Sequence, residues 1–278
     1  MMRIAAIQTR AVAGDQEANL ARIEEAARAA AAAGASLLIA PELALPGYGA
    51  GDDMRMLAQT SGGDLVTRLA LVASELKIAI IAGFAEMAEE EIHNSAVFVD
   101  GRNPPIVYRK THLYGDYERG IFTAGYPSAS IIEYRGLRIG ILICYDVEFP
   151  ENVRRLAVAG AHLIAVPTAL PATGHAKLIA RKMIPVRAFE NQVFVAYVNH
   201  CGADDLFCYA GLSAIAAPDG TLLAAADSKP EALLVADIRP DDFAASAIAA
   251  PYLRDVHHCS EWSQDQGAAH ARDGHFAP

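Results

Sequence analysis

The stretch Gly140-Ile-Leu-Ile-Cys144-Tyr-Asp-Val-Glu-Phe-Pro150 places one cysteine between an aliphatic run and a proline. The residues from Arg138 to Ile143 are nearly all aliphatic, which is typical of a strand covered on both faces. Pro150 suits the first turn of a helix, because its missing N–H would have had no partner there. A cysteine at such a turn lies near free backbone N–H groups, which lower a thiol pKa and can stabilise an oxyanion. The same pattern also fits a small buried cysteine without any chemistry.

The composition provides ample material for a hydrophobic core. The chain has 278 residues, of which 53% are hydrophobic and 20% charged, and this balance argues against disorder. A net charge of −10 without a basic cluster disfavours a nucleic-acid or anionic-membrane partner. No apolar run reaches the roughly 18 residues of a membrane span, and the first residues lack the apolar core of a signal peptide. We therefore expect a cytoplasmic protein.

The cysteines and histidines predict neither disulfides nor a metal centre. The four cysteines, Cys144, Cys201, Cys208 and Cys259, form no C-x-x-C pair and show no zinc-ligand spacing. They are too few for a disulfide scaffold at this length, which indicates a reducing compartment. The C-terminal histidines also fit no familiar ligand set; they are His257, His258, His270 and His275.

Predicted strands and helices alternate along the whole chain, with hairpins and parallel crossovers mixed. We expect strands over 3–8, 36–40, 78–84, 93–99, 106–109, 129–134, 137–143, 162–166, 193–199, 209–217, 221–226 and 232–238. We expect helices over 15–33, 64–76, 151–159 and 177–191, and a loop over 110–125. The pattern predicts one α/β domain over residues 1–278, with a core over about 2–238. The periodicity fades after residue 238, which predicts an irregular or partly disordered arm over 239–278.

Three ionisable residues follow the ends of separate predicted strands, namely Glu42, Lys110 and Cys144. The C-terminal ends of strands in α/β sheets face a crevice where ligands bind, so we expect these side chains to converge. Taken singly, Glu42 could cap a turn or a helix, and Lys110 could be a solvated loop charge. Three such residues at three strand ends favour a common site.

The chain resembles the carbon–nitrogen hydrolase (nitrilase) superfamily at three motifs. These are Pro41-Glu42-Leu43 with Pro46-Gly47-Tyr48, then Tyr108-Arg109-Lys110-Thr111-His112-Leu113, then Gly140 through Glu151. The likeness extends from Met2 to about Ile238, and it implies a four-layer α-β-β-α sandwich in a homodimer or higher homo-oligomer. It also implies a Glu-Lys-Cys triad.

The resemblance implies a role for one further glutamate. Glu118 lies eight residues after Lys110. It would orient Lys110 and hold the amide. Without the resemblance, Glu118 would be interpreted as a surface carboxylate in a charged loop.

The triad can hydrolyse a small-molecule amide without a metal or an organic cofactor. An unperturbed thiol is mostly protonated at neutral pH, so Cys144 needs a base or a cationic neighbour. Lys110 can favour the thiolate and then stabilise an oxyanion, with the Tyr145 backbone N–H as a second donor. Glu42 can take the thiol proton, pass it to departing ammonia and then activate water.

The residues after the cysteine narrow the predicted activity. Tyr145-Asp146 stands where nitrilases typically have Trp-Glu, which makes nitrile hydrolysis a less favoured activity. The cysteine motif, Pro167-Thr168-Ala169-Leu170 and Pro251-Tyr-Leu-Arg-Asp255 look most like the stereoselective and aliphatic amidase branch. The chain departs from that branch at Val256-His257-His258, which leaves the role of the tail open. A carbamoyl-amine hydrolase, a nitrilase and an inactive binding subunit are the alternatives.

The resemblance also assigns residues to loops that border the site. They are Tyr48, Tyr114, Tyr145, Phe149, Thr168 and Ala169. The aromatic ones could equally be ordinary core residues. Glu148 stands where a basic residue would hold an acidic substrate, which predicts a neutral or cationic acyl group and not a dicarboxylate half-amide. The sequence leaves the substrate, its stereochemistry and the number of subunits open.

Overall fold

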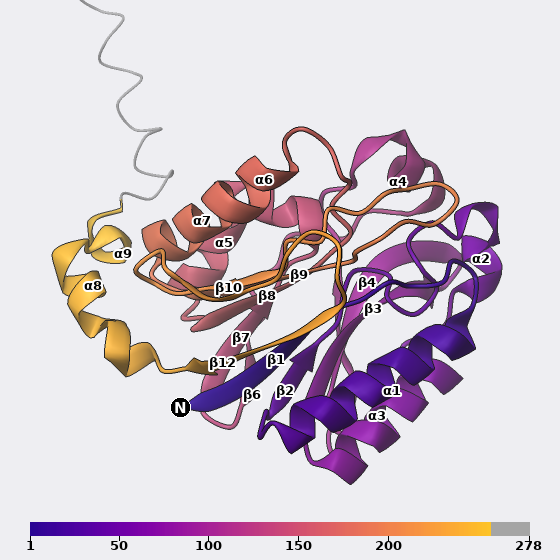
Figure 1. The fold of residues 1–278 in the computed structure, drawn as a ribbon, viewed down its shortest axis with the longest axis horizontal. Coiled ribbons are helices and arrows are strands. Elements are labelled where there is room, and N and C mark those ends of the chain that lie inside the picture. Colours follow the sequence, from indigo (N-terminus) through magenta and orange to yellow (C-terminus); the bar gives the residue numbers. More distant parts are fainter. Residues whose placement is uncertain (257–278) are drawn as a thin grey trace, which may run out of the picture.

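The computed structural model describes residues 1–256, which fold around two six-stranded sheets (Figure 1). The first sheet contains, in spatial order, β12 (Ala232–Ile238), β1 (Met2–Gln8), β2 (Leu37–Ile39), β3 (Ala79–Ala88), β4 (Glu91–Val99) and β5 (Ile106–Arg109). The second contains β11 (Leu222–Ala225), β10 (Ala214–Ala216), β9 (Phe194–Asn199), β8 (Leu163–Thr168), β7 (Leu137–Ile141) and β6 (Ile132–Tyr134). Both sheets are mixed, as the combination of hairpins and crossovers predicted.

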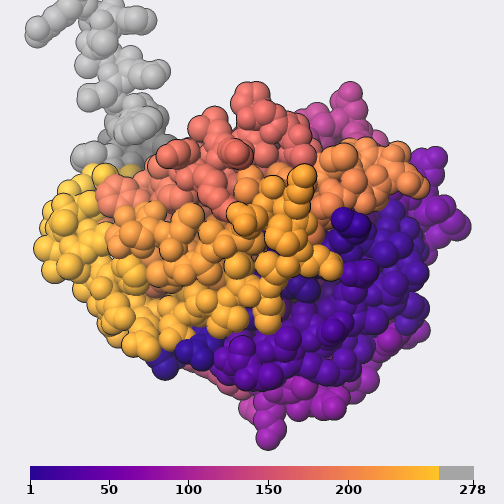
Figure 2. Space-filling model, viewed as in Figure 1, coloured from indigo at the N-terminus to yellow at the C-terminus, as the bar shows by residue number. Residues whose placement is uncertain are grey.

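Helices provide the parallel crossovers of each sheet. In the first sheet, β1, β2 and β3 are parallel and are connected through α1 (Gln16–Ala32) and through α2 (Met54–Leu57) and α3 (Asp64–Leu76). In the second, β7, β8 and β9 are parallel and are connected through α5 (Pro150–Val158) and α7 (Ile184–Asn191). The last strand, β12, pairs antiparallel with the first, so Ile238 lies opposite Met2. Figure 2 accordingly shows the N-terminal and C-terminal segments meeting on one face of the molecule.

Alternate residues of each strand face different apolar layers, which gives the order α-β-β-α. Ile4 belongs to the core between the two sheets, whereas Ala5 faces α1 and α3. In the same way Leu163 faces the first sheet and Ile164 faces α5 and α7. Strands covered on both faces read as continuous apolar runs, which is the pattern that the sequence showed. The predicted four-layer sandwich is confirmed.

Three sequence-based expectations about local structure were wrong. The predicted loop over 110–125 contains α4 (Gly115–Ile121), a short charged helix that has no apolar periodicity to predict it. The predicted helix over 177–191 is divided into α6 (Ala176–Leu178), a π-helical turn at Ile179–Met183 and α7. The C-terminal arm is not irregular at first, because it forms a 3-10 turn at Pro240–Phe243, then α8 (Ala244–Ala249) and α9 (Tyr252–Asp255).

Several further properties concern only the described residues. No helix within residues 1–256 is long and apolar enough to cross a membrane. The cysteines in this part of the chain, Cys144, Cys201 and Cys208, are free. The histidines of the predicted tail, from His257 onward, and Cys259 lie outside the described residues.

Candidate active site

The three residues predicted to converge do so. Glu42 follows β2, Lys110 follows β5 in the same sheet, and Cys144 follows β7 in the other sheet. The ammonium of Lys110 donates to Glu42 Oε1 at 2.6 Å and to Glu118 Oε1 at 2.6 Å. The side chains of Lys110 and Glu42 are 0% exposed and that of Glu118 is 1% exposed, so this charge cluster is shielded from water.

Two buried carboxylates keep Lys110 charged. Burial by itself lowers the pKa of Lys110, but the charges of Glu42 and Glu118 outweigh that effect and raise the pKa well above its ordinary value. The pKa of the Glu118 carboxyl is raised, because burial and the nearby Glu42 charge oppose its ionisation more than Lys110 favours it. Lys110 therefore acts as a fixed cation and not as a base.

Cys144 begins a 3-10 turn at Cys144–Glu148, and α5 follows from Pro150. Its backbone φ is 44°, in the left-handed region that costs a residue with a Cβ roughly 1–3 kcal/mol. The thiol feels the charges of Glu42, Lys110 and Glu118, which places it beside the cluster. The strand, turn and helix order that the sequence predicted is confirmed.

The expectation that the free backbone N–H groups would lower the thiol pKa was wrong. Burial raises the pKa of Cys144 well above its ordinary value, and the negative charge of Glu42 adds to the rise. Lys110 and a hydrogen bond from the Ala169 backbone oppose it without reversing it. The resting thiol is therefore neutral and needs a base at the moment of attack.

Glu42 lies in a turn that is fixed by β3 and by polar residues. The Gly83 N–H donates to the Pro41 carbonyl, and a Cβ at Gly83 would lie 2.2 Å from the backbone nitrogen of Leu43. Asn94 Nδ2 donates to Glu42 Oε1 at 2.7 Å. Among the described residues, the other carboxylate oxygen of Glu42, Oε2, has no hydrogen-bond partner although it is buried.

The predicted supporting residue, Glu118, is the first buried contact that α4 provides. Its Oε1 accepts hydrogen bonds from Lys110 and from the Tyr48 hydroxyl at 2.8 Å, and its Oε2 accepts one from the Tyr114 N–H at 2.8 Å. Glu118 is therefore a buried partner of Lys110 and not a surface carboxylate. Tyr48 is buried against it and does not face open space.

The sequence argument missed Asp146. Its buried carboxylate accepts hydrogen bonds from the Tyr108 hydroxyl at 2.9 Å, from Thr111 Oγ1 at 2.8 Å and from the His112 N–H at 2.8 Å. These donors flank Lys110, so Asp146 connects the cysteine turn to the lysine segment. Asn94 was missed as well, although a polar run at residues 93–95 inside an apolar strand was a usable signal.

Cys144 opens into a cavity of about 250 Å³. Three of the predicted substrate-binding residues, Tyr114, Tyr145 and Glu148, are in its wall. The wall also contains residues that were not predicted, namely Leu170, Pro171, Thr173, His175, Leu178, Ile179 and Met183. Most of these come from the segment between β8 and the π-helical turn, where sequence patterns gave no reason to expect a substrate pocket.

The other predicted pocket residues have different surroundings. The Phe149 ring stacks on His112 with a centroid distance of 4.1 Å. Thr168 is buried and donates to the Val166 carbonyl at 2.9 Å. Ala169 contributes its backbone next to the thiol. None of these three is in the wall of the 250 Å³ cavity.

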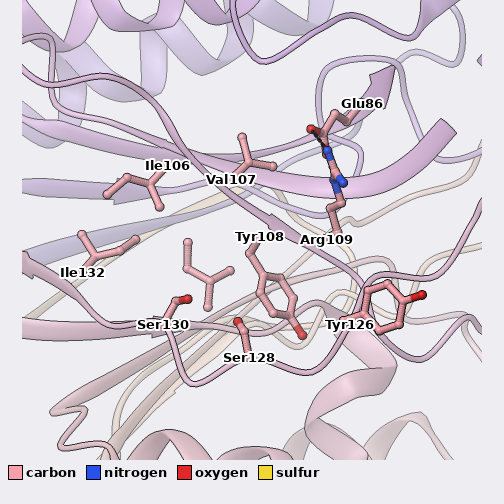
Figure 3. Close-up of a pocket in the computed structure, with 10 residues that line it drawn as sticks. Glu86, Ile106, Val107, Tyr108, Arg109, Tyr126, Ser128, Ser130 and Ile132 are labelled. Carbon is pink, nitrogen blue, oxygen red and sulfur yellow. Dashed lines mark hydrogen bonds and ion pairs between the residues drawn. The ribbon is translucent and has the colours of Figure 1, made fainter. Parts of the chain in front are cut away.

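A second cavity, of about 340 Å³, is separate from the cysteine (Figure 3). Figure 3 shows the Arg109 guanidinium facing the Glu86 carboxylate, with the Tyr108 ring directed toward Ser128. Arg109 donates to Glu86 through two nitrogens at 2.7 and 2.8 Å, so both charges are satisfied within the protein. Within residues 1–256, no cluster of three His, Cys, Asp or Glu residues has the arrangement of a metal site.

Comparison with known proteins gives the family. The sequence model of the carbon–nitrogen hydrolase family matches residues 3–248. The chain belongs to the carbon–nitrogen hydrolase family. This hydrolase is 39% identical to a protein of Pseudomonas protegens named "Hydrolase in pqqF 5′ region", over 91% of this chain and 88% of the relative. It is 34% identical to an (R)-stereoselective amidase of a Pseudomonas species, over 91% of each chain.

A solved structure supports the same assignment. The amidase from Nesterenkonia sp. AN1, of the nitrilase superfamily, aligns with this hydrolase at a TM-score of 0.83 and 32% identity, covering 95% of this chain and 99% of that one. Another structure of the AN1 amidase has the acetamide moiety of fluoroacetamide covalently added at its active-site cysteine. The family, the fold and these relatives establish this chain as a hydrolase of carbon–nitrogen bonds in the nitrilase superfamily.

Proposed function

We propose that this hydrolase is an amidase that converts a small carboxamide and water into a carboxylic acid and ammonia. The reaction passes through a thioester on Cys144, with Glu42 as the base and Lys110 as the fixed cation. The observation that supports this most is the buried Lys110, held at 2.6 Å from Glu42 beside the thiol. A second observation is that Glu42 Oε2 is free to accept a proton.

The first half of the reaction forms the thioester. Glu42 removes the thiol proton as the sulfur attacks the amide carbon, and the carbonyl electron pair moves onto oxygen. Lys110 and the Tyr145 N–H stabilise that oxyanion; Tyr145 is at the start of a 3-10 turn, where N–H groups have no partner within the helix. The tetrahedral intermediate then collapses, the C–N bond breaks, and Glu42 gives its proton to the departing ammonia.

The second half releases the acid. Glu42, again a carboxylate, removes a proton from water as the water oxygen attacks the thioester carbon. The C–S bond breaks, the thiolate recovers a proton from Glu42, and the carboxylic acid leaves. Glu118 supports both halves by holding Lys110 in place through its 2.6 Å contact.

Ammonia release from simple amides tests this proposal. Butanamide and propanamide would be incubated with the parent, with Cys144→Ala and with Cys208→Ala, a control at the exposed cysteine. We expect Cys144→Ala to lose activity by roughly a thousandfold or more, because the nucleophile is gone, and Cys208→Ala to match the parent. Added hydroxylamine would intercept the thioester as a hydroxamate. Equal ammonia release by Cys144→Ala and the parent would contradict the mechanism.

The same panel separates the alternatives. Carbon dioxide formed together with ammonia from an N-carbamoyl amine would indicate a carbamoyl-amine hydrolase, and faster turnover of butanenitrile than of butanamide would indicate a nitrilase. A protein that hydrolyses none of these compounds would fit the inactive binding subunit. The homo-oligomeric assembly and the cytoplasmic location stay predictions, and light scattering after gel filtration tests the first.

A further inference from the structure

One carboxylate, that of Glu148, is in the wall of the cavity beside Cys144. Glu148 is half-buried at the end of the 3-10 turn that begins with Cys144. The other wall residues are aliphatic, aromatic or uncharged, apart from the titratable His175 and Cys144 itself, and no Lys or Arg is among them. The cavity therefore has a negative charge of its own.

Within the described residues, the Glu148 carboxylate has no hydrogen bond and no salt bridge. The nearest cations are committed elsewhere: Lys110 is held by Glu42 and Glu118. The Arg187 guanidinium binds the Glu148 backbone carbonyl and the Glu190 carboxylate instead. Burial raises the pKa of Glu148, and the charges of Lys110 and Arg187 oppose that rise without cancelling it. A half-buried carboxylate without a partner is unfavourable, and an incoming cation would relieve it.

We propose that the site selects amides whose acyl group carries an ammonium, with Glu148 as the residue that binds it. This inference rests on the proposed amidase function and adds the substrate class. The rings of Tyr114 and Tyr145 meet edge to face at 5.2 Å in the same wall and offer π surfaces that also attract a cation. A cavity of about 250 Å³ suits a short amino amide and not a long peptide.

Two isosteric pairs of substrates isolate the charge. Glycinamide and propanamide differ by an ammonium in place of a methyl group, and so do 3-aminopropanamide and butanamide. In the parent, we expect kcat/KM to be about tenfold higher for the cationic member of at least one pair, which corresponds to one partly shielded ion pair. Glu148→Gln should lower that ratio to about one. Glu151→Gln is the matched control, because Glu151 is an exposed carboxylate three residues away.

A measurement on the parent covers the case in which Glu148→Gln does not fold. Propylammonium and 1-propanol would be compared as protectants of Cys144 against iodoacetamide. Protection by propylammonium at about tenfold lower concentration supports the proposal, and equal protection contradicts it.

The outcomes separate this inference from the amidase assignment. If butanamide and propanamide are hydrolysed at least as well as their cationic partners, the ammonium site is wrong and the amidase remains. A preference unchanged in a folded Glu148→Gln would also overturn it, because another group would then bind the cation. If no amide of the panel releases ammonia, the amidase proposal itself fails.

Discussion

The buried Asp146 carboxylate accepts a hydrogen bond of 2.9 Å from the Tyr108 hydroxyl, and this contact joins the two sheets at the active site. Tyr108 is on β5 of the first sheet, two residues before Lys110, and Asp146 is two residues after Cys144. The nucleophile and the cation thus belong to different sheets and are held in register by one carboxylate. The distance between them depends on this link as much as on the strands.

Replacement of Asp146 by asparagine should therefore impair both stability and catalysis. The amide keeps the shape but turns a donor toward the donors at Tyr108, Thr111 and His112. We expect the free energy of unfolding to fall by about 2–3 kcal/mol and kcat/KM to fall at least tenfold. Urea unfolding and amide hydrolysis measure the two effects. Asp116→Asn, on the exposed side of α4, should change neither, and a parent-like Asp146→Asn would refute the linking role.

Replacement of Glu118 by glutamine should lower the pKa of Lys110. Burial lowers that pKa and the two carboxylates raise it, so removing one negative charge moves it down toward the assay range. We expect kcat to fall and the alkaline limb of the kcat/KM profile to appear at lower pH than in the parent. Asp116→Asn again serves as the control. An alkaline limb that stays in place would mean that Glu118 does not set the charge of Lys110.

Replacement of Gly83 by alanine should disturb the turn that carries Glu42. The added Cβ would lie 2.2 Å from Leu43 N and 2.6 Å from the Pro41 carbonyl oxygen, and both are backbone atoms that cannot rotate away. We expect a loss of roughly 1–3 kcal/mol in stability and at least a tenfold loss in kcat/KM. Gly62→Ala is the matched control, because a Cβ there meets no atom within 4 Å. Full activity in Gly83→Ala would show that the turn tolerates displacement.

The Glu86 carboxyl should contribute to stability above mildly acidic pH. Burial raises its pKa, but hydrogen bonds from Arg109 and Ser95 outweigh this and leave the pKa below its ordinary value. A carboxyl with a lower pKa in the folded state stabilises the protein above its unfolded pKa of about 4.3, and this contribution is lost as the pH falls through the folded value.

Glu86→Gln should accordingly be less stable than the parent at pH 7, and the difference should shrink from about pH 5 downward. Urea unfolding at a series of pH values measures it, with the exposed Glu90→Gln as the control. A difference that grows on acidification would reverse the assigned sign.

Much of the fold was predictable because it follows local rules. The strands on which Leu38 and Ile164 lie are short apolar runs, and a run covered on both faces has no polar alternation to obscure it. The strand, turn and helix around Cys144 were predictable as well, because Pro150 begins a helix wherever it meets one. The helix that carries Glu118 was not, since its first contacts are with Lys110 and Tyr48 and not with its own neighbours.

The chain alone determined which residues could do chemistry: a carboxylate, an ammonium and a thiol, each at the end of a buried strand. Only the packing of distant segments decided their state. The thiol of Cys144 is neutral, and Lys110 is locked in its charged form, because burial and the charges around a group set its pKa. Asp146 likewise gained its role when the second sheet met the first, since its hydrogen-bond donors come from a segment more than thirty residues away.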